Sequence, residues 1–173
     1  MITIEPLQKK YLEDAVVLTQ QIFPINYVDP RESIEASLDE EQLEKFQKKL
    51  VEELGEPKTR VLLYWLAVEK DCDRVVGITG IYERVGDPLG LCWLGWYCVD
   101  PSYRGQGIGT ELLDFTLDWA RSQGKKTMML YTSTDPAESR AHEMYKQRGF
   151  VVNEDRERIP EGEYEIFFME CKL

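Results

Sequence analysis

The sequence predicts an α/β fold in which helices cover both faces of a mixed, mostly antiparallel sheet, giving three layers. The central stretch from Val61 to Val99 consists of apolar runs separated by turn residues, which is typical of strands joined by short turns. On either side of it, apolar residues recur at helical spacing behind capping residues. The 173-residue length fits one domain, residues 1–173.

The first third of the chain predicts a short strand followed by helices. Ile2 to Ile4 is the strand candidate, and Lys9 to Phe23 reads as a helix that Pro24 ends. Aspartate is a favoured N-cap and proline is favoured at the first helical position. Two helix starts are therefore expected in the stretch up to Leu54, namely Asp29-Pro30-Arg31-Glu32 and Asp39-Glu40-Glu41-Gln42.

The remaining elements follow from changes of period along the chain. The predicted strands are Val61–Glu69, Arg74–Glu83, Leu91–Val99, Thr127–Tyr131, Phe150–Asn153 and Tyr164–Cys171. Between them, apolar residues at helical spacing predict a helix from Gly107 to Gln123. A last helix is expected to start at Asp135-Pro136 and to end at Gly149.

Composition excludes several classes of protein. With 21 Lys and Arg against 32 Asp and Glu, the net charge is −11, which argues against binding to nucleic acid. The longest apolar run, Val61–Val68, is far shorter than the ~20 residues of a membrane span, and no secretory signal is visible. Four cysteines without a C-x-x-C pair and a single histidine argue against a metal site. We expect free thiols and a cytoplasmic location.

A glycine-rich segment carries the chemistry. In Tyr97-Cys98-Val99-Asp100-Pro101-Ser102-Tyr103-Arg104-Gly105-Gln106-Gly107-Ile108-Gly109-Thr110, a strand enters a loop that opens an amphipathic helix. The first N–H groups of a helix lack internal partners and carry partial positive charge, and glycines let a phosphate approach them closely. The dinucleotide pattern G-x-G-x-x-G fails, because Thr110 stands where its last glycine belongs, and a nucleotide P-loop is absent. The segment therefore predicts an anion cradle of another kind.

Two motifs identify a family resemblance. Arg104-x-x-Gly107-x-Gly109 resembles the acetyl-CoA motif [QR]-x-x-G-x-[GA] of the GNAT-type N-acetyltransferases, and Tyr145-Lys146-Gln147-Arg148-Gly149-Phe150 resembles their Y-x-x-x-G-F signature. The resemblance implies a GNAT-like fold with a splayed central pair of strands. It also implies acetyl transfer from acetyl-CoA (coenzyme A) to a primary amine, by direct attack in a ternary complex.

The resemblance implies a set of cofactor-binding residues. The backbone of the strand before the loop would bind the pantetheine arm, and the loop would bind the diphosphate. The set comprises Tyr97, Cys98, Val99, Arg104, Gly105, Gln106, Gly107, Ile108, Gly109 and Thr110. Arg104 would assist electrostatically, or instead bridge to surface carboxylates. Gly95 would suit a strand distortion, or be a small packing residue.

The resemblance also nominates catalytic residues. Tyr145 matches the general acid that protonates the departing thiolate, although its place on a predicted apolar helix stripe also fits core packing. Relatives often carry a glutamate base in the strand before the loop, but Leu91–Val99 has no acidic residue. Glu83 is a candidate base acting through water, or a solvated strand end. Cys98 is an acyl-acceptor candidate, with a packed thiol as the alternative.

The acceptor is expected to be a small-molecule or protein amine, and the acidic surface favours a cationic one. Tyr27, in the loop after the first helix, is a candidate for the acceptor groove. The expected state is a monomer or a homodimer, with no nucleic-acid or membrane partner. An alternative function is an acyl-CoA-binding regulatory module that has lost catalysis, which would fit the missing strand glutamate.

Overall fold

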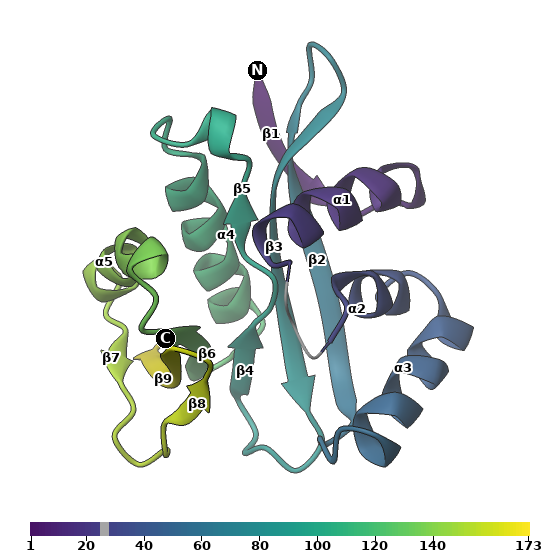
Figure 1. Cartoon of the computed structure of the whole chain (residues 1–173). Coiled ribbons are helices and arrows are strands. Elements are labelled where there is room, and N and C mark those ends of the chain that lie inside the picture. Colours follow the sequence, from purple (N-terminus) through teal and green to yellow (C-terminus); the bar gives the residue numbers. More distant parts are fainter. Residues whose placement is uncertain (25–27) are drawn as a thin grey trace. The chain divides into compact units, whose positions relative to one another are not determined.

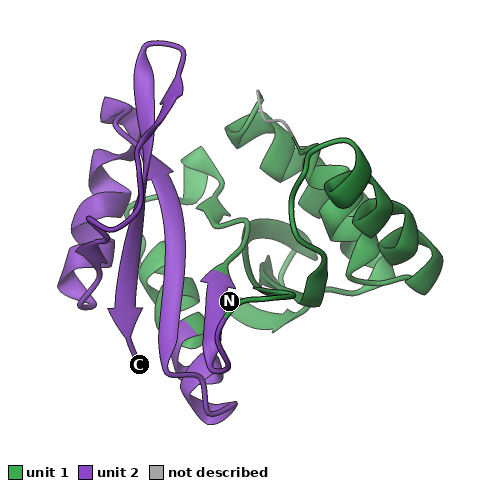
Figure 2. Cartoon of the chain, turned by 90° about the horizontal axis from the view of Figure 1, so that it is seen from below, with its two compact units in different colours: residues 1–87, 94–116 green, residues 88–93, 117–173 purple. Residues whose placement is uncertain are grey.

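The computed structural model describes residues 1–24 and 28–173. The chain divides into two compact units, which are coloured separately in Figure 2. Unit 1 comprises Met1–Asp87 and Leu94–Thr116, and unit 2 comprises Pro88–Trp93 and Leu117–Leu173.

The strands of unit 1 are antiparallel throughout. Strand β1 (Ile2–Pro6) pairs with β2 (Thr59–Glu69), which pairs with β3 (Arg74–Arg84). The two-residue strand β5 (Cys98–Val99) pairs with β3. A short turn joins β2 to β3, which favours antiparallel pairing, so the antiparallel prediction is confirmed for these strands.

The helices of unit 1 begin where capping chemistry predicts them. Helix α1 (Leu12–Ile22) follows a 3₁₀ turn, η1 (Lys9–Tyr11), while α2 (Pro30–Ala36) and α3 (Glu40–Glu52) form the two predicted helices of the next stretch. The Asp29 carboxylate accepts a hydrogen bond from the N–H of Arg31 at 2.9 Å. The Asp39 carboxylate accepts one from the N–H of Gln42 at 3.1 Å. Both caps satisfy amides that the helix itself cannot bond.

Apolar side chains cover both faces of the unit 1 sheet. One cluster joins α1 and α2 to β2 and β3, with Val16, Ile34, Leu66 and Ile78 buried within it, and Figure 1 shows α1 and α2 on that face. A second cluster contains Ala67, Val76, Val99, Ile108 and Leu112, and it packs the start of helix α4 (Ile108–Ser122) against the other face. Neighbouring residues on a strand point to opposite faces, so helix, sheet and helix form three layers in this unit.

Unit 2 is built around β6 (Thr127–Ser133) and β9 (Tyr164–Lys172), which are antiparallel. Strand β4 (Leu91–Leu94) pairs with β6 in parallel, and β7 (Val151–Val152) and β8 (Ile159–Glu161) pair with β9 antiparallel. Helix α5 (Ser139–Gln147) follows a 3₁₀ turn, η3 (Pro136–Glu138). Helix α4 has its first turns in unit 1 and its last turns in unit 2. The fold is therefore a mixed α/β structure with a mostly antiparallel sheet, as predicted.

Three local predictions need correction. The predicted single strand Leu91–Val99 is broken, because Gly95 to Tyr97 lie outside β4 and β5. Strand β8 was not predicted, since Pro160 and exposed polar neighbours give it no strand pattern, and its residues are exposed. The Asp135 cap opens the 3₁₀ turn η3, and α5 begins only at Ser139.

Candidate cofactor-binding and catalytic site

The break in the predicted strand precedes β5 and the turn that leads to the glycine-rich loop. The N–H of Gly95 donates to the carbonyl of Gly80 at 2.8 Å, so this residue bonds to β3 although it belongs to neither β4 nor β5. A Cβ at Gly95 would lie 3.2 Å from the Gly80 carbonyl carbon and 3.3 Å from Tyr64 Cε1. Gly95 thus stands both at the strand distortion and at a close backbone approach, the two alternatives that the sequence left open.

The residues after the break hold the start of α4 in place. Cys98 and Val99 pair with Ile78 and Gly77 of β3. Tyr97 lies outside the strand, and its hydroxyl donates to the carbonyl of Gly109 at 2.7 Å. This side-chain anchor of the helix start was missed in the sequence, because Tyr97 and Gly109 lie 12 residues apart and match no capping pattern.

A capped turn connects β5 to the loop. The Asp100 carboxylate accepts a hydrogen bond from the N–H of Ser102 at 2.8 Å and pairs with Arg74 Nη2 at 2.8 Å. Hydrogen bonds from Ser102, together with the charge of Arg74, hold the pKa of Asp100 below its usual range. The turn Pro101–Tyr103 (η2) therefore leads the chain from the strand to Arg104 along a fixed path.

Arg104 lies exposed at the entrance to the loop. Its Nε donates to the carbonyl of Val99 at 3.2 Å, which directs the side chain back toward β5. Among the residues that the structure describes, no carboxylate forms an ion pair with Arg104, so the bridge to surface carboxylates is not made. The guanidinium can therefore place its charge at the glycine-rich loop.

The loop adopts a conformation that needs glycine. Gly105 has φ +80° and Gly107 has φ +87°, in the left-handed region that other residues rarely adopt. A Cβ at either position would meet nothing within 4 Å, so the space beside the loop is open. The N–H of Glu111, bonding to the Gly107 carbonyl at 3.0 Å, closes the first turn of α4. The amides that precede Glu111 are the donors that a helix start offers to an anion.

Burial fixes the helix behind this loop. Ile108 is 4% exposed and packs in the core, whereas Gly105, Gln106 and Gly107 are exposed, and Gly109 and Thr110 are half-buried. Deeper in the helix, the hydroxyls of Thr79 and Thr116 lie 2.7 Å apart in a buried hydrogen bond between β3 and α4. Buried contacts between α4 and β3 therefore fix the position of the glycine-rich loop within unit 1.

Two further candidates lie in unit 1. Cys98 is buried, and burial raises the pKa of its thiol to about 12. The carboxylate of Glu83 is only 4% exposed and pairs with Arg60 Nη2 at 2.6 Å, so this residue is not a solvated strand end. The Cys98 thiol is therefore neutral at pH 7, which fits a packed side chain rather than an acyl acceptor.

Tyr145 lies in unit 2, at the end of α5. It is 7% exposed, and its ring packs against Phe150 at 5.7 Å between centroids. Gly149 has φ +85°, which turns the chain so that the N–H of Phe150 donates to the Tyr145 carbonyl at 3.1 Å. The Y-x-x-x-G-F pattern is thus a helix end with a ring contact, which makes Tyr145 well packed.

The start of the same helix carries a polar cluster. The Glu138 carboxylate accepts from the Ser133 hydroxyl at 2.6 Å and from the Thr132 hydroxyl. His142 Nε2 lies 2.9 Å from Thr132 Oγ1, and its ring meets Phe167 edge to face. The Glu138 carboxylate therefore bonds to the end of β6.

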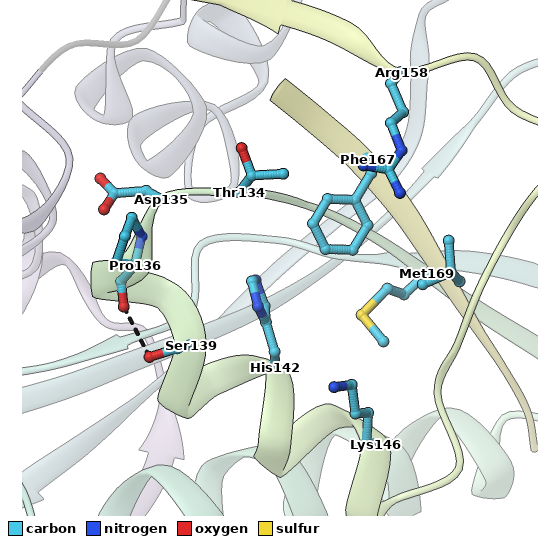
Figure 3. Close-up of a pocket in the computed structure, with 10 residues that line it drawn as sticks. Thr134, Asp135, Pro136, Ser139, His142, Lys146, Arg158, Phe167 and Met169 are labelled. Atoms are coloured by element: carbon cyan, nitrogen blue, oxygen red, sulfur yellow. Dashed lines mark hydrogen bonds between the residues drawn. The ribbon is translucent and has the colours of Figure 1, made fainter. Parts of the chain in front are cut away.

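A pocket of about 320 Å³ opens beside this cluster, within unit 2 (Figure 3). One face of α5 and one face of β9 supply half of its lining residues, and three of the lining side chains are basic. The lining residues are Thr134, Asp135, Pro136, Ser139, His142, Lys146, Val152, Arg158, Phe167 and Met169. None of the predicted catalytic or cofactor-binding residues lines it.

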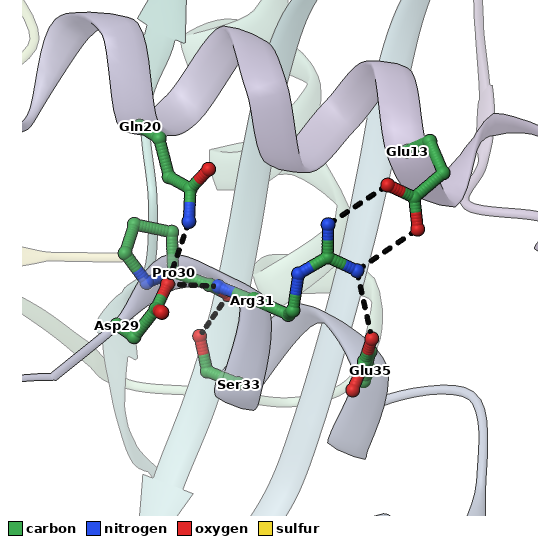
Figure 4. A network of polar contacts seen from close by, with 7 residues as sticks. All are labelled: Glu13, Gln20, Asp29, Pro30, Arg31, Ser33 and Glu35. Carbon is green, nitrogen blue, oxygen red and sulfur yellow. Dashed lines mark hydrogen bonds and ion pairs between the residues drawn. The ribbon is translucent and has the colours of Figure 1, made fainter.

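A polar network ties α2 to α1 in unit 1 (Figure 4). The Arg31 guanidinium binds both carboxylate oxygens of Glu13, at 2.8 and 2.9 Å, and lies 3.0 Å from a carboxylate oxygen of Glu35. This pairing holds the pKa of Glu13 below its usual range. Gln20 also donates to Asp29 at 2.9 Å. Tyr27, the candidate for the acceptor groove, lies outside the residues that the structure describes.

Two further searches concern the same described residues. Within residues 1–24 and 28–173, no three His, Cys, Asp or Glu side chains gather as they would around a metal ion. Over those ranges, none of the helices has the length and apolar character needed to cross a membrane.

Comparison with known proteins places this geometry in a family. A family model described as the acetyltransferase (GNAT) family matches residues 23–150. An uncharacterized N-acetyltransferase from Methanocaldococcus jannaschii is 36% identical over 56 residues, which are 32% of this chain and 24% of that protein. The match thus spans about a quarter of that relative's length.

Solved structures share the fold. A GNAT-family acetyltransferase from Staphylococcus aureus Mu50 has a TM-score of 0.69 at 20% identity, with 100% of this chain and 99% of that chain covered. The ribosomal-protein-S18-alanine N-acetyltransferase of Escherichia coli has a TM-score of 0.68 at 18% identity, with 99% and 94% covered. The PaiA N-acetyltransferase of Thermoplasma acidophilum, in complex with coenzyme A, has a TM-score of 0.62 at 19% identity, with 100% and 99% covered. The chain belongs to the GNAT acetyltransferase family, whose members are acyltransferases.

Proposed function

We propose that this protein is an N-acetyltransferase that transfers the acetyl group of acetyl-CoA to a primary amine, on a small molecule or a protein, by direct attack in a ternary complex. The observation that carries the proposal is the glycine-rich loop, whose two positive-φ glycines open a row of amides at the start of α4. Family membership supports acyl transfer in general, and the loop supports the particular cofactor.

The residues present fit coenzyme A. The cofactor carries phosphates, and the loop offers backbone donors beside the exposed Arg104 guanidinium. The proposed cofactor-binding residues are Tyr97, Cys98, Val99, Arg104, Gly105, Gln106, Gly107, Ile108, Gly109 and Thr110. A similar fold binds coenzyme A in the Thermoplasma acidophilum structure, which supports the proposal.

Acetyl-CoA supplies an activated acetyl group as a thioester, and this chain must then move protons. An alkyl ammonium group is mostly charged at neutral pH and must lose a proton before it attacks. We assign that role to the Glu83 carboxylate acting through water. Tyr145 is the proposed acid that protonates the departing thiolate.

The proposal also includes the domain organisation, the cellular location, the oligomeric state and the partners of the protein. Residues 1–173 act as one N-acetyltransferase domain in the cytoplasm, as a monomer or a homodimer, without nucleic-acid or membrane partners. All four cysteines are free thiols in the structure, which supports a reducing compartment.

The test is release of free thiol from acetyl-CoA, followed over a panel of amines that includes small molecules and lysine peptides. We expect turnover with at least one amine. Tyr145→Phe keeps the ring against Phe150 but removes the hydroxyl, and should lower kcat by about 10²–10⁴-fold with coenzyme A affinity unchanged.

The matched control is Tyr164→Phe, which removes the hydroxyl of an exposed tyrosine and should leave kcat unchanged. An unchanged rate for Tyr145→Phe would remove Tyr145 from the mechanism. Tight coenzyme A binding in calorimetry without turnover of any amine would favour the regulatory module.

A further inference from the structure

The strand break before β5 contains one residue more than regular pairing with β3 allows. Cys98 pairs with Ile78, and in an uninterrupted antiparallel register Trp96 would then lie opposite Gly80. Instead, the N–H of Gly95 donates to the Gly80 carbonyl at 2.8 Å. Two residues of the break therefore face one residue of β3, which is the arrangement of a β-bulge, a feature that often lies next to active sites.

The two residues of the bulge, Trp96 and Tyr97, send their side chains into opposite layers of unit 1. Trp96 packs against the apolar cluster of α1 and α2, and Tyr97 packs against the cluster that contains the start of α4. The Tyr97 hydroxyl donates to the Gly109 carbonyl at 2.7 Å, and the indole Nε1–H of Trp96 donates to Ser33 Oγ of α2 at 2.7 Å. Both layers therefore hold the break where its backbone departs from regular pairing.

Ser33 is a fixed acceptor for the Trp96 indole. It is 5% exposed, and its hydroxyl donates to the Pro30 carbonyl at 3.2 Å, which leaves the oxygen lone pairs for the indole N–H. Arg31 in the same helix binds both carboxylate oxygens of Glu13 in α1 (Figure 4). The indole hydrogen bond thus connects the break to a pair of helices that are themselves tied together.

Packing also fixes the orientation of the Trp96 ring. Its centroid lies 5.3 Å from that of Phe23, at the end of α1, with the two rings tilted by 41°. The backbone of the break is confined as well, because a Cβ at Gly95 would lie 3.3 Å from Tyr64 Cε1. A tryptophan with a packed ring and a bonded N–H keeps one orientation, and it holds its own backbone with it.

The break leads directly into the backbone from Tyr97 to Val99, which the proposed function assigns to the pantetheine arm and the thioester. A backbone N–H polarises a carbonyl only when it points at the oxygen from hydrogen-bond distance. A displacement of about 1 Å can cost about 10²-fold in rate. A residue that fixes the break therefore fixes where these amides point.

We propose that Trp96 is a positioning residue for acetyl transfer. Through its hydrogen bond to Ser33, it holds the bulge, and with it the amides from Tyr97 to Val99, in the geometry that the thioester requires. This inference rests on the proposed N-acetyltransferase function and deepens it. It gives helix α2 a part in the reaction, although α2 lies far from the glycine-rich loop in the sequence.

The test measures kcat, the Kd of coenzyme A and the Tm of two variants. Ser33→Ala removes the acceptor, and Trp96→Phe removes the donor but keeps a ring beside Phe23. Each should lower kcat by about 3- to 10-fold, the worth of one hydrogen bond. The Kd of coenzyme A should change less than kcat does, because the diphosphate is assigned to the glycine-rich loop. Ser33→Thr keeps the hydroxyl and should retain the wild-type kcat.

A double variant tests whether the two side chains act together. In the Trp96→Phe background, Ser33→Ala should lower kcat no further, because the hydrogen bond is already lost. A further loss of kcat, as large as that of Ser33→Ala alone, would overturn the proposal.

Ser37→Ala is the matched control. The Ser37 hydroxyl donates to the Ile34 carbonyl at 2.7 Å, so its hydrogen bond stays within the end of α2. This variant should lower the Tm about as much as Ser33→Ala and leave kcat unchanged. Equal losses of kcat in Ser33→Ala and Ser37→Ala would overturn the proposal, and so would a wild-type kcat in Ser33→Ala.

Failure of the proposed function is distinguishable from failure of this inference. If no amine is turned over, hydrogen exchange of the full chain, followed by NMR, still tests the hold on the break. The Gly95 amide, bonded to Gly80, reports the conformation of the break. Ser33→Ala should speed its exchange by about 3- to 10-fold, and Ser37→Ala should not. Unchanged exchange at Gly95 in Ser33→Ala would refute the positioning role.

Discussion

The thiol of Cys98 is buried in the apolar cluster that joins α1 and α2 to β2 and β3, directly after the strand break. Burial raises its pKa to about 12, despite the opposing effect of the nearby Arg104 charge. A thiol in that state carries almost no thiolate at neutral pH, and thiolate is the nucleophile. The position therefore serves backbone pairing to Ile78 rather than covalent catalysis.

Iodoacetamide labelling followed by mass spectrometry checks this. In the folded chain at pH 7 to 9, Cys98 should remain unmodified, because its thiolate forms only toward pH 12. The exposed Cys72 should react first, although its hydrogen bond to Glu69 raises its pKa. Cys98→Ser should keep turnover, and labelling of Cys98 as fast as Cys72 would contradict the buried thiol.

Other single residues show what a sequence leaves undecided. From the sequence, Glu83 is either a base acting through water or a solvated strand end. The structure buries it in an ion pair with Arg60, a residue on another strand, which excludes the solvated strand end. Tyr97 reads as part of a strand, yet its hydroxyl anchors Gly109. In both cases the partner is distant in sequence, so no local pattern could indicate it.

Elements whose ends depend on local chemistry follow the sequence closely. The caps at Asp29 and Asp39 bond to amides two and three residues ahead, so a short stretch of sequence is enough to predict them. The break of Leu91–Val99 into β4 and β5 has no such pattern. Strand β4 pairs with β6 and β5 pairs with β3, and strand pairing is a non-local contact.

Two glycines, Gly77 and Gly107, would be sensitive to substitution for different reasons, one steric and one conformational. A Cβ at Gly77 would lie 2.8 Å from Leu112 Cδ1 and 3.2 Å from the Cys98 carbonyl oxygen. Gly77→Ala should therefore destabilise the fold by about 1–3 kcal/mol through overpacking. Gly107→Ala meets no atom but forces alanine into φ +87°, at a cost of about 1–2 kcal/mol.

Thermal unfolding and calorimetric titration with coenzyme A distinguish the two variants. Gly77→Ala should lower the Tm by several degrees, at about 2–4 °C per kcal/mol. Gly107→Ala should weaken coenzyme A binding out of proportion to its Tm. Gly86→Ala is the control, since Gly86 has φ +98° with nothing within 4 Å and lies outside the loop. Equal loss of binding in Gly86→Ala would show that backbone strain alone explains the effect.

At the scale of the whole molecule, net charge and local field oppose each other. The chain carries −11, and coenzyme A is an anion, whereas the loop offers helix amides and Arg104. The salt concentration determines how far the net negative charge acts on the approaching ligand, compared with the local positive field of the loop. The Debye length is about 30 Å at 0.01 M and about 8 Å at 0.15 M, so only low salt lets the distant carboxylates act.

We therefore expect coenzyme A to associate faster at 0.15 M than at 0.01 M salt, as measured by stopped-flow fluorescence. Arg104→Gln should slow association at both salt concentrations, because it removes a charge close to the bound phosphates. The control Arg121→Gln changes net charge equally, on the exposed end of α4. Association that slows steadily with added salt would show that the local positive field outweighs the net charge.

The sequence by itself determined the fold class, most element boundaries, the family and the glycine-rich loop. These depend on periodicity, caps and positive-φ glycines, which act between residues close together in the chain. Only the tertiary structure decided that Arg104 has no carboxylate partner among the described residues, that Glu83 is paired, that Cys98 is neutral, and that Arg156 lies on two rings. Those properties depend on burial and on partners brought together by folding, and both are set by strand pairing over long sequence separations.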